Sequence, residues 1–180
     1  MNVYCWIIGV EIMSGDEGVL DNYPGYEIKC FEWIDIEKYL EQIIDMQFEN
    51  TYKFHYPDKK PNRDYIKRKI LELEKHLQNG NTYFIGVIKE DNLYGYIWCY
   101  ESIFIDEKRM NINSIFIDEK ARGTGLGQKL INKIKQISAE NNCDTMGTHY
   151  AIFNKSAGGF YSNNGFEVTR IEAVCDLGRH

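Results

Sequence analysis

The spacing of apolar residues changes along this chain between the two-residue period of strands and the longer period of helices. Residues 26–33 alternate apolar and charged side chains, which predicts a half-buried strand. Asp35 is expected to cap a helix that runs to about residue 48, because apolar residues recur there at helical spacing. Residues 50–62 contain two prolines and predict a loop. A second amphipathic helix is predicted over 63–78, ended by an Asn-Gly pair.

The period becomes two in the middle of the chain. Strands are predicted over 82–89, 93–105 and 112–117, separated by charged turns at 91–92 and 106–110. Short polar turns join strands that neighbour each other in a sheet, so we expect an antiparallel meander here.

In the last third of the chain, segments with the helical spacing of apolar residues alternate with segments of strand spacing. It predicts a helix over 126–140, a strand over 143–153, a short helix over 155–163 and a final strand over 166–175. The complete order is β-α-α-β-β-β-α-β-α-β. This order predicts an α/β fold of the α+β type, with one mixed, mostly antiparallel sheet and helices on both faces.

Length and composition favour one domain, since 180 residues with 43% hydrophobic side chains are enough for a packed core. We expect residues 26–180 to form it, and residues 1–25 to be an N-terminal extension, loosely attached or adding an edge strand. The apolar start has no Lys or Arg before it and no cleavage pattern, which argues against a secretory signal. No apolar run approaches the roughly 20 residues that cross a bilayer, so a cytoplasmic protein without membrane contact is expected.

Charge and cysteine content indicate which binding partners and which covalent or metal cross-links to expect. The formal charge of −6 argues against nucleic acid as a partner and weakly favours a cationic one. Five cysteines without a Cys-x-x-Cys pair predict neither a disulfide framework nor a metal site. The sequence leaves monomer and homodimer open.

A glycine-rich turn, Arg122-Gly123-Thr124-Gly125-Leu126-Gly127, lies between a predicted strand and a predicted helix. Unpaired N–H groups and the dipole at a helix start attract anions, and glycines let the backbone approach a phosphate. Arg122 adds a permanent positive charge, and Gln128 and Lys129 are within reach of the same group. A dinucleotide fingerprint would need glycine in place of Gln128, and no Gly-Lys-Ser/Thr P-loop is present. A pyrophosphate is the expected ligand, with a purely structural turn as the alternative.

Two short motifs occur in the last third of the chain. The first, Arg/Gln-x-x-Gly-x-Gly/Ala, is met by Arg122, Gly125 and Gly127. The second, Asn-x-x-Ala-x-x-apolar-Tyr-x-x-x-Gly-Phe, is met by Asn154, Ala157, Phe160, Tyr161, Gly165 and Phe166. Both resemble motifs of the GNAT superfamily of N-acetyltransferases. The predicted order of elements from residue 26 onward is also similar to that family. The resemblance implies a GNAT-like fold, acetyl-CoA as co-substrate and a primary amine as acetyl acceptor.

The resemblance also implies roles for individual residues. The backbone of Ile115, Phe116 and Ile117 would pair with the pantetheine amides. The pyrophosphate would be bound by Arg122, Gly123, Thr124, Gly125, Leu126, Gly127 and Gln128. Asn154 would hydrogen-bond the pantetheine arm, and Tyr161 would lie near the thioester sulfur. In the family a neutral amine attacks the thioester directly, and a phenol with a pKa of about 10 is protonated at neutral pH, so Tyr161 is predicted to be the general acid. A packing role for Tyr161 is the alternative.

The general base is less defined by the sequence. Some relatives use a glutamate in the strand before the glycine turn, and residues 112–117 contain no carboxylate. Others place an acid five residues before the motif asparagine, where this chain has His149, and a histidine is able to accept a proton near neutral pH. Glu101 is the second candidate. Both residues also suit purely structural roles, with His149 filling a strand and Glu101 facing solvent.

The acceptor amine is open at this level: a small amine, an amino sugar or antibiotic, or a protein N-terminus or lysine. His55, with Tyr52, Phe54 and Tyr56, lies in the proline-bounded segment and is expected either to line an acceptor pocket or only to pack that loop. A non-catalytic acyl-CoA-binding sensor or regulatory module is the second hypothesis. A structural protein with an accidental glycine turn is the third.

Overall fold

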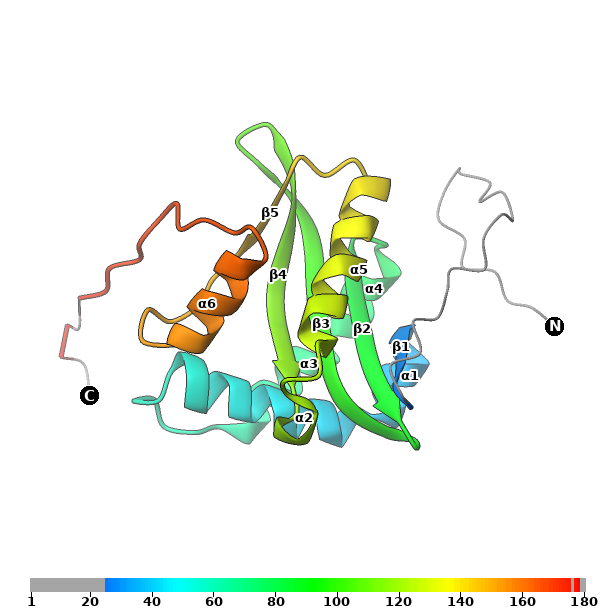
Figure 1. Ribbon diagram of the computed structural model, residues 1–180. Coiled ribbons are helices and arrows are strands. Elements are labelled where there is room, and N and C mark those ends of the chain that lie inside the picture. Colours follow the sequence, from blue (N-terminus) through cyan, green and yellow to red (C-terminus); the bar gives the residue numbers. More distant parts are fainter. Residues whose placement is uncertain (1–24, 176, 179–180) are drawn as a thin grey trace.

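The computed structural model describes residues 25–175 and 177–178 (Figure 1). The predicted extension over 1–25 therefore lies outside the described residues, apart from Gly25. No helix in the described part of the chain is long and apolar enough to cross a membrane.

Five strands form one sheet in the order of the chain (Figure 1). They are β1 (Glu27–Cys30), β2 (Thr82–Lys89), β3 (Asn92–Phe104), β4 (Glu107–Ile117) and β5 (Thr145–Thr148). The first four pair antiparallel with their neighbours, and β5 runs parallel to β4 after a helical crossover. The predicted mixed, mostly antiparallel sheet is confirmed.

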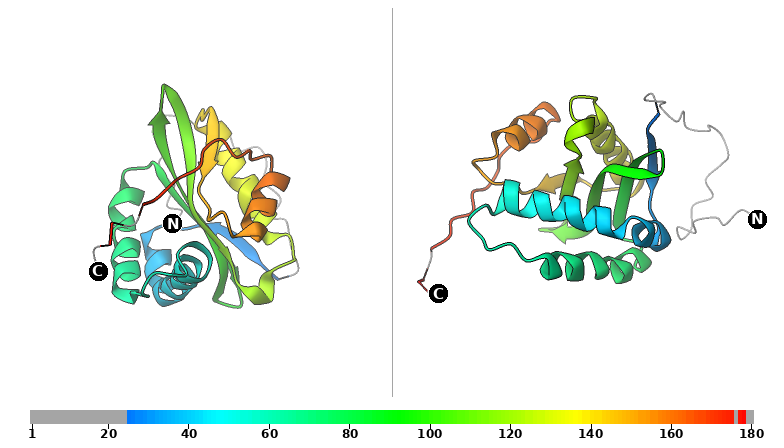
Figure 2. Two further views of the ribbon diagram at one scale, coloured as in Figure 1. Left: turned by 90° about the vertical axis from the view of Figure 1, so that its left-hand side faces the viewer. Right: turned by 90° about the horizontal axis from the view of Figure 1, so that it is seen from below.

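Helices cover both faces of the sheet (Figure 2). One face carries α1 (Trp33–Lys38), α2 (Leu40–Glu49), the π-helix η1 (Asn50–His55), α3 (Arg63–Leu71) and α4 (Leu73–Gln78). The other face carries α5 (Leu126–Glu140) and α6 (Lys155–Asn163), and the short 3-10 helix η2 (Glu119–Ala121) follows β4.

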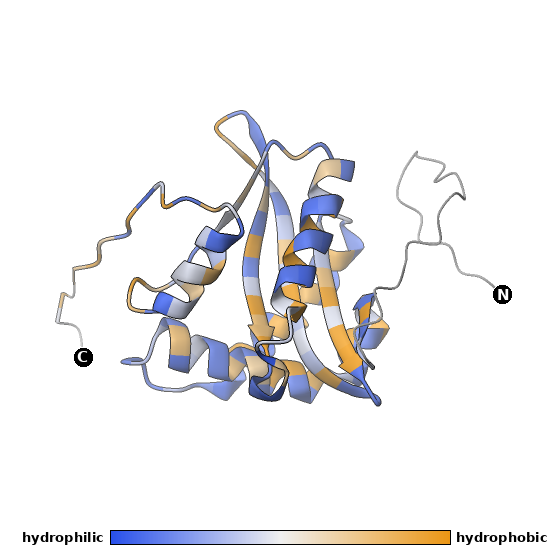
Figure 3. Ribbon diagram, viewed as in Figure 1, coloured by the Kyte–Doolittle hydropathy of each residue, from blue (hydrophilic) through white to orange (hydrophobic). Residues whose placement is uncertain are grey.

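The alternation of strand side chains fills two separate cores. Phe84 and Tyr96 point toward the α1–α4 face, whereas Ile85 and Ile97 point toward α5. The apolar stripe of α5 packs on the second core, and Figure 3 shows a largely hydrophilic outer surface on this helix. At the lower end of the sheet, in the view of Figure 1, α2, the start of α5 and the end of β4 come together.

The boundaries at the first helix differ from the prediction. β1 ends at Cys30, and α1 begins at Trp33, so Trp33 belongs to a helix and not to a strand. Glu32 is the N-cap, and the Asp35 carboxylate accepts a hydrogen bond from the Glu32 backbone N–H at 3.1 Å. Asp35 therefore caps from the third helical position, because a carboxylate there reaches back to the first free N–H group.

The predicted loop over 50–62 is wrong for its first six residues, which continue α2 as η1. The prolines act only from residue 57 onward, and contacts with the sheet described below hold the preceding turn in helical form. The predicted helix over 63–78 is present as α3 and α4, with a break at Glu72.

The turn predicted over 106–110 is also wrong in extent. Residues 105–106 form a two-residue hairpin turn with positive φ, and β4 starts at Glu107, five residues earlier than predicted. The charged residues there are accommodated in the strand because neighbouring elements pair with them: Lys108 with Glu101, and the Arg109 guanidinium with the Thr145 hydroxyl.

The C-terminal strands are shorter than predicted. β5 covers four residues instead of 143–153, and residues 166–175 form no strand. β5 pairs with β4 only over 109–112, so it presents little edge on which a further strand could be extended. The apolar side chains of Val168, Ile171 and Val174 are consequently exposed.

Candidate active site

A cleft of 480 Å³ opens beside the second half of β4. Its walls come from β4, the start of α5, α6, the residues that follow β5, and η1. The predicted site residues that it brings together are Ile115, Phe116, Ile117, Arg122, Gly123, Gly125, Leu126, Gly127, Gln128, His149, Asn154 and Tyr161. Thr124 and Glu101 are absent from its described lining.

A bulge in β4 creates the open strand edge. Trp98 pairs with Ser114 and Cys99 with Ile112, so Asn113 is an extra residue without a partner on β3. On the other side, pairing with β5 ends at Ile112. Residues 115–117 therefore present a strand edge toward the cleft, the arrangement on which an extended ligand can add as another strand.

The glycine turn is built by backbone conformations that favour glycine. Gly123 has φ +75° and Gly125, the N-cap of α5, has φ +84°. With this conformation α5 begins at the cleft, which Gly125, Leu126 and Gly127 line, and the free N–H groups and the dipole of a helix start favour an anion there.

Gly127 serves packing between the two helices. A Cβ atom at this position would lie 3.2 Å from the ring of Phe160, so glycine lets α6 approach the start of α5 closely. The Thr124 hydroxyl donates to the backbone carbonyl of Ala121 at 2.6 Å, which stabilises the turn from behind. Thr124 was predicted to bind the pyrophosphate. In the structure its hydroxyl supports the turn, and the residue is absent from the described lining of the cleft.

Arg122 connects the glycine turn to the end of α2. Its Nε donates to the Ile117 carbonyl at 2.9 Å, and its guanidinium lies 5.5 Å from the ring centroids of both Phe54 and Phe116. Glu49 is 3.9 Å from the same guanidinium. The permanent charge is therefore held at the cleft by two aromatic rings and one half-buried carboxylate.

Two polar residues join the start of α5 to α6. The Gln128 side-chain amide donates to Asn164, whose own amide donates to the Phe160 carbonyl at 2.8 Å. Asn154 is the N-cap of α6, where its Oδ1 accepts from the Ala157 backbone N–H at 3.1 Å. The Asn154 Nδ2 is the part of that side chain that is left to donate to a ligand in the cleft.

Tyr161 places a phenol at the inner end of the cleft. Its residue is only 6% exposed, its ring stacks on Tyr150 with centroids 5.5 Å apart, and its hydroxyl accepts from the Thr148 hydroxyl at 3.3 Å. Burial raises the pKa of Tyr161 above its ordinary value, and the bond from Thr148 opposes this in part. The phenol is therefore protonated at neutral pH and is able to donate a proton.

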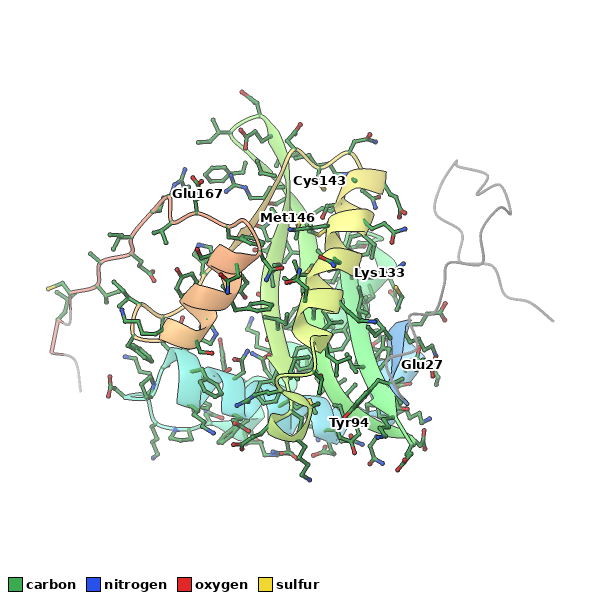
Figure 4. The ribbon with its side chains drawn as sticks, viewed as in Figure 1. Glu27, Tyr94, Lys133, Cys143, Met146 and Glu167 are labelled. Carbon is green, nitrogen blue, oxygen red and sulfur yellow. The ribbon has the colours of Figure 1, made fainter. Side chains whose placement is uncertain are left out.

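The two candidates for the base lie in different places. His149 directly follows β5, is exposed and lines the cleft. Glu101 accepts from the Tyr83 hydroxyl at 2.7 Å and forms a 2.8 Å ion pair with Lys108, whose pKa is raised chiefly by that hydrogen bond. Glu101 also influences the pKa of Cys143, which Figure 4 shows beyond the C-terminal end of α5, far from the glycine turn at its start. Glu101 is therefore engaged outside the cleft.

A buried polar network beside the cleft was not predicted. The Asn50 side-chain amide donates to the Ser114 hydroxyl at 2.9 Å, which donates to Gln47 Oε1 at 2.8 Å. The Tyr96 hydroxyl donates to the same oxygen at 2.5 Å. The network ties η1 to the β4 bulge. No local pattern could have indicated it, because its members are separated in the sequence by as many as 67 residues.

The aromatic segment predicted to line an acceptor pocket divides into two pairs. Phe54 and His55 line the cleft, whereas Tyr52 packs on another ring in α2 and Tyr56 is exposed. Burial lowers the pKa of His55 below its ordinary value, which keeps this imidazole neutral at pH 7. In the described part of the chain, no group of three or more His, Cys, Asp or Glu side chains could hold a metal ion.

An open strand edge, an anion-binding helix start and a buried phenol are thus combined in one cleft. A sequence model described as the acetyltransferase (GNAT) family matches residues 39–166, which is most of the chain. The chain belongs to this family. It is accordingly an acyltransferase, and GNAT enzymes generally use acetyl-CoA as co-substrate. No curated protein matches the chain.

Solved structures share the GNAT fold at low sequence identity. An aminoglycoside acetyltransferase from an uncultured soil metagenomic sample, in complex with trehalose, is 20% identical, with 88% of this chain and 99% of that chain covered and a TM-score of 0.64. A ribosomal-protein-alanine N-acetyltransferase from Brucella melitensis is 13% identical, with 84% and 99% covered and a TM-score of 0.60. A transcriptional regulator from Bacillus halodurans is 16% identical, with 84% and 99% covered and a TM-score of 0.67. At these identities the likeness concerns the fold alone.

Proposed function

We propose that this GNAT protein transfers an acetyl group from acetyl-CoA to the nitrogen of a primary amine, by direct attack while both substrates are bound. The observation that carries the proposal is the continuity of one cleft from the glycine turn, along the β4 edge, to the Tyr161 hydroxyl. A ligand with a pyrophosphate at one end, an amide-bearing arm and a reactive thioester matches this order of groups.

The co-substrate would be held by backbone groups more than by side chains. The first N–H groups of α5 and Arg122 would receive the pyrophosphate, and Gln128 borders the same position. The open edge of residues 115–117 would pair with the pantetheine amides, to which the Asn154 Nδ2 would also donate.

The reaction replaces a C–S bond by a C–N bond and needs two proton transfers. The neutral amine nitrogen attacks the thioester carbonyl carbon, a C–N bond forms, and the C–S bond breaks. Tyr161 donates its phenolic proton to the departing sulfur, and His149 accepts, directly or through water, the proton that the amine loses. Positioning both substrates in one cleft supplies a large part of the rate enhancement.

The proposal is tested by mixing the full-length chain with acetyl-CoA and a panel of primary amines, while released thiol and acetylated amine are measured. We expect equal amounts of both products, and a lower rate of formation of both with the His149→Asn variant. Binding of acetyl-CoA without thiol release across the panel would instead identify a sensor. The scattered cysteines suit a reducing compartment, so we place the reaction in the cytoplasm.

A further inference from the structure

The described lining of the cleft contains no Asp or Glu. Its basic side chains are Arg122, His55 and His149, and its remaining polar groups are neutral hydroxyls and amides. A site that selects a polycation needs carboxylates, because each ammonium group that leaves water without a charged partner loses its hydration energy.

The acidic residues on the cleft side of the chain that belong to α2 are engaged with basic groups. Glu49 lies 3.0 Å from Lys53 and 3.9 Å from Arg122, and farther along α2 both Asp45 and Glu41 bind Arg63. These three carboxylates are therefore not available to an acceptor, although the net charge of −6 alone weakly favoured a cationic one.

Asn50 supplies a neutral acceptor group at the wall formed by η1. The residue is only 7% exposed, and its Nδ2 is committed to the Ser114 hydroxyl. No described residue donates to its Oδ1, and that oxygen retains access to the cleft that Asn50 lines. A fixed amide oxygen of this kind accepts one N–H of an amine without requiring that the amine be charged.

From these observations, and resting on the proposed function, we infer that the acetyl acceptor is a primary amine with a single basic nitrogen, received by the Asn50 Oδ1. A small monoamine and a peptide α-amine share this chemistry. A polyamine or an aminoglycoside does not, because the described lining offers no carboxylate to pair with its additional ammonium groups.

The decisive experiment compares acceptors that differ in charge. The full-length chain is given acetyl-CoA with butylamine, a lysine-free peptide with a free N-terminus, spermidine or an aminoglycoside. We expect kcat/KM for at least one of the monoamines to exceed that for spermidine and the aminoglycoside by about tenfold or more. The ratio between butylamine and the peptide distinguishes the two sources of the amine. Preferred acetylation of spermidine or the aminoglycoside would overturn the inference and leave the proposed function intact, whereas no thiol release from any acceptor would overturn both.

A charge introduced into the cleft provides a gain-of-function test. Asn113 is exposed on the β4 bulge and lines the cleft, so Asn113→Asp adds one carboxylate with little disturbance of packing. We expect this variant to raise kcat/KM for spermidine relative to butylamine by about fivefold. Asn79→Asp, the same change at the exposed end of α4, is the matched control and should leave the ratio unchanged. An unchanged ratio in Asn113→Asp would contradict the inference.

The role of Asn50 is tested by comparing the KM for the acceptor with the KM for acetyl-CoA. Asn50→Ala should raise the acceptor KM by about five- to tenfold, with the KM for acetyl-CoA unchanged. Ser114→Ala removes the same network bond but keeps the Asn50 Oδ1, so it should change the acceptor KM less than Asn50→Ala does. Equal effects of the two variants would show that only the network matters and would refute the assignment of Oδ1.

Discussion

The start of α5 and the π-helix η1 line the same cleft, but they are held in place in different ways. The start of α5 depends on Gly123 and Gly125, whose positive φ angles are a local backbone property. The position of η1 depends on Asn50, which is anchored to Ser114 on a distant strand. The proposed co-substrate wall is thus built from backbone groups, whereas the proposed acceptor wall is built from side chains.

This difference has a consequence for specificity. Backbone N–H groups are present whatever the side chains are, so an anion-binding helix start can be retained while the acceptor wall changes. The acceptor wall consists of side chains on η1 and the β4 bulge, and each substitution there changes its chemistry. Four predictions test the two walls, from the largest expected effect to the smallest.

Gly125→Val should damage the co-substrate wall most. A β-branched residue is poorly tolerated at φ +84°, so the turn must change and the first N–H groups of α5 would no longer face the pyrophosphate. We expect kcat/KM for acetyl-CoA to fall by about 100-fold or more, as when a transition-state donor is lost. Gly80→Val is the matched control, since Gly80 has φ +73° and lies outside the cleft lining; it should reduce stability and leave KM unchanged. Equal kinetic losses in both variants would refute the assignment.

Tyr161→Phe tests the proposed general acid. Removal of a general acid should lower kcat by about 100-fold or more, with KM for acetyl-CoA little changed. Because burial raises the pKa of Tyr161, the wild-type rate should show no high-pH decline from this group until above pH 10. Thr148→Val, which removes the hydroxyl that donates to Tyr161, is the control for packing. A kcat for Tyr161→Phe within a factor of two of wild type would exclude the tyrosine from proton transfer.

Ser114→Ala should lower the stability of the folded chain, because Ser114 anchors the proposed acceptor wall. It leaves the buried amide of Asn50 without its acceptor, and we expect the free energy of unfolding to fall by about 1–3 kcal/mol. Chemical denaturation measures this change. Ser102→Ala, which removes a less buried partner of Asn111, should cost less. A smaller loss for Ser114→Ala than for Ser102→Ala would show that the network does not hold η1.

The smallest effect concerns the pH dependence of stability. Burial lowers the pKa of His55 in the folded chain, so near pH 6.5 the unfolded chain binds more protons than the folded one. The contribution of His55 to stability is therefore present above that pH and is lost as the pH falls. His55→Asn should lose less stability than wild type between pH 7 and pH 5, measured by denaturation at each pH. His76→Asn, at an exposed helix position, should follow the wild-type curve.

Local patterns predicted a large part of the architecture. The limits of α5 and α6 agree with the prediction at both ends, because a strong apolar stripe and polar ends specify a helix within its own residues. Residues 166–175 show the reverse case: their composition favours a strand, yet a strand also needs a partner edge, which the short β5 does not present.

For the site too, residues in local motifs were predicted correctly, whereas residues whose role depends on distant contacts were not. Arg122, Gly125 and Tyr161 stand in two compact motifs and do line one cleft. Glu101 was the second candidate for the base because of its place on the long predicted strand, but the structure engages it with Tyr83 and Lys108 outside the cleft. The network of Asn50, whose partners come from distant strands, had no signature in the chain.

Residue type and spacing were sufficient where the physical constraint is local, as in the helical periodicity of α5 and α6. They were insufficient wherever the constraint is a contact between distant residues. The bulge at Asn113, the continuation of α2 into η1, and the absence of carboxylates from the described cleft lining depend on which strands and helices meet. Only the tertiary structure decided these, because the burial, charge and hydrogen bonding of a side chain are properties of its neighbours in space.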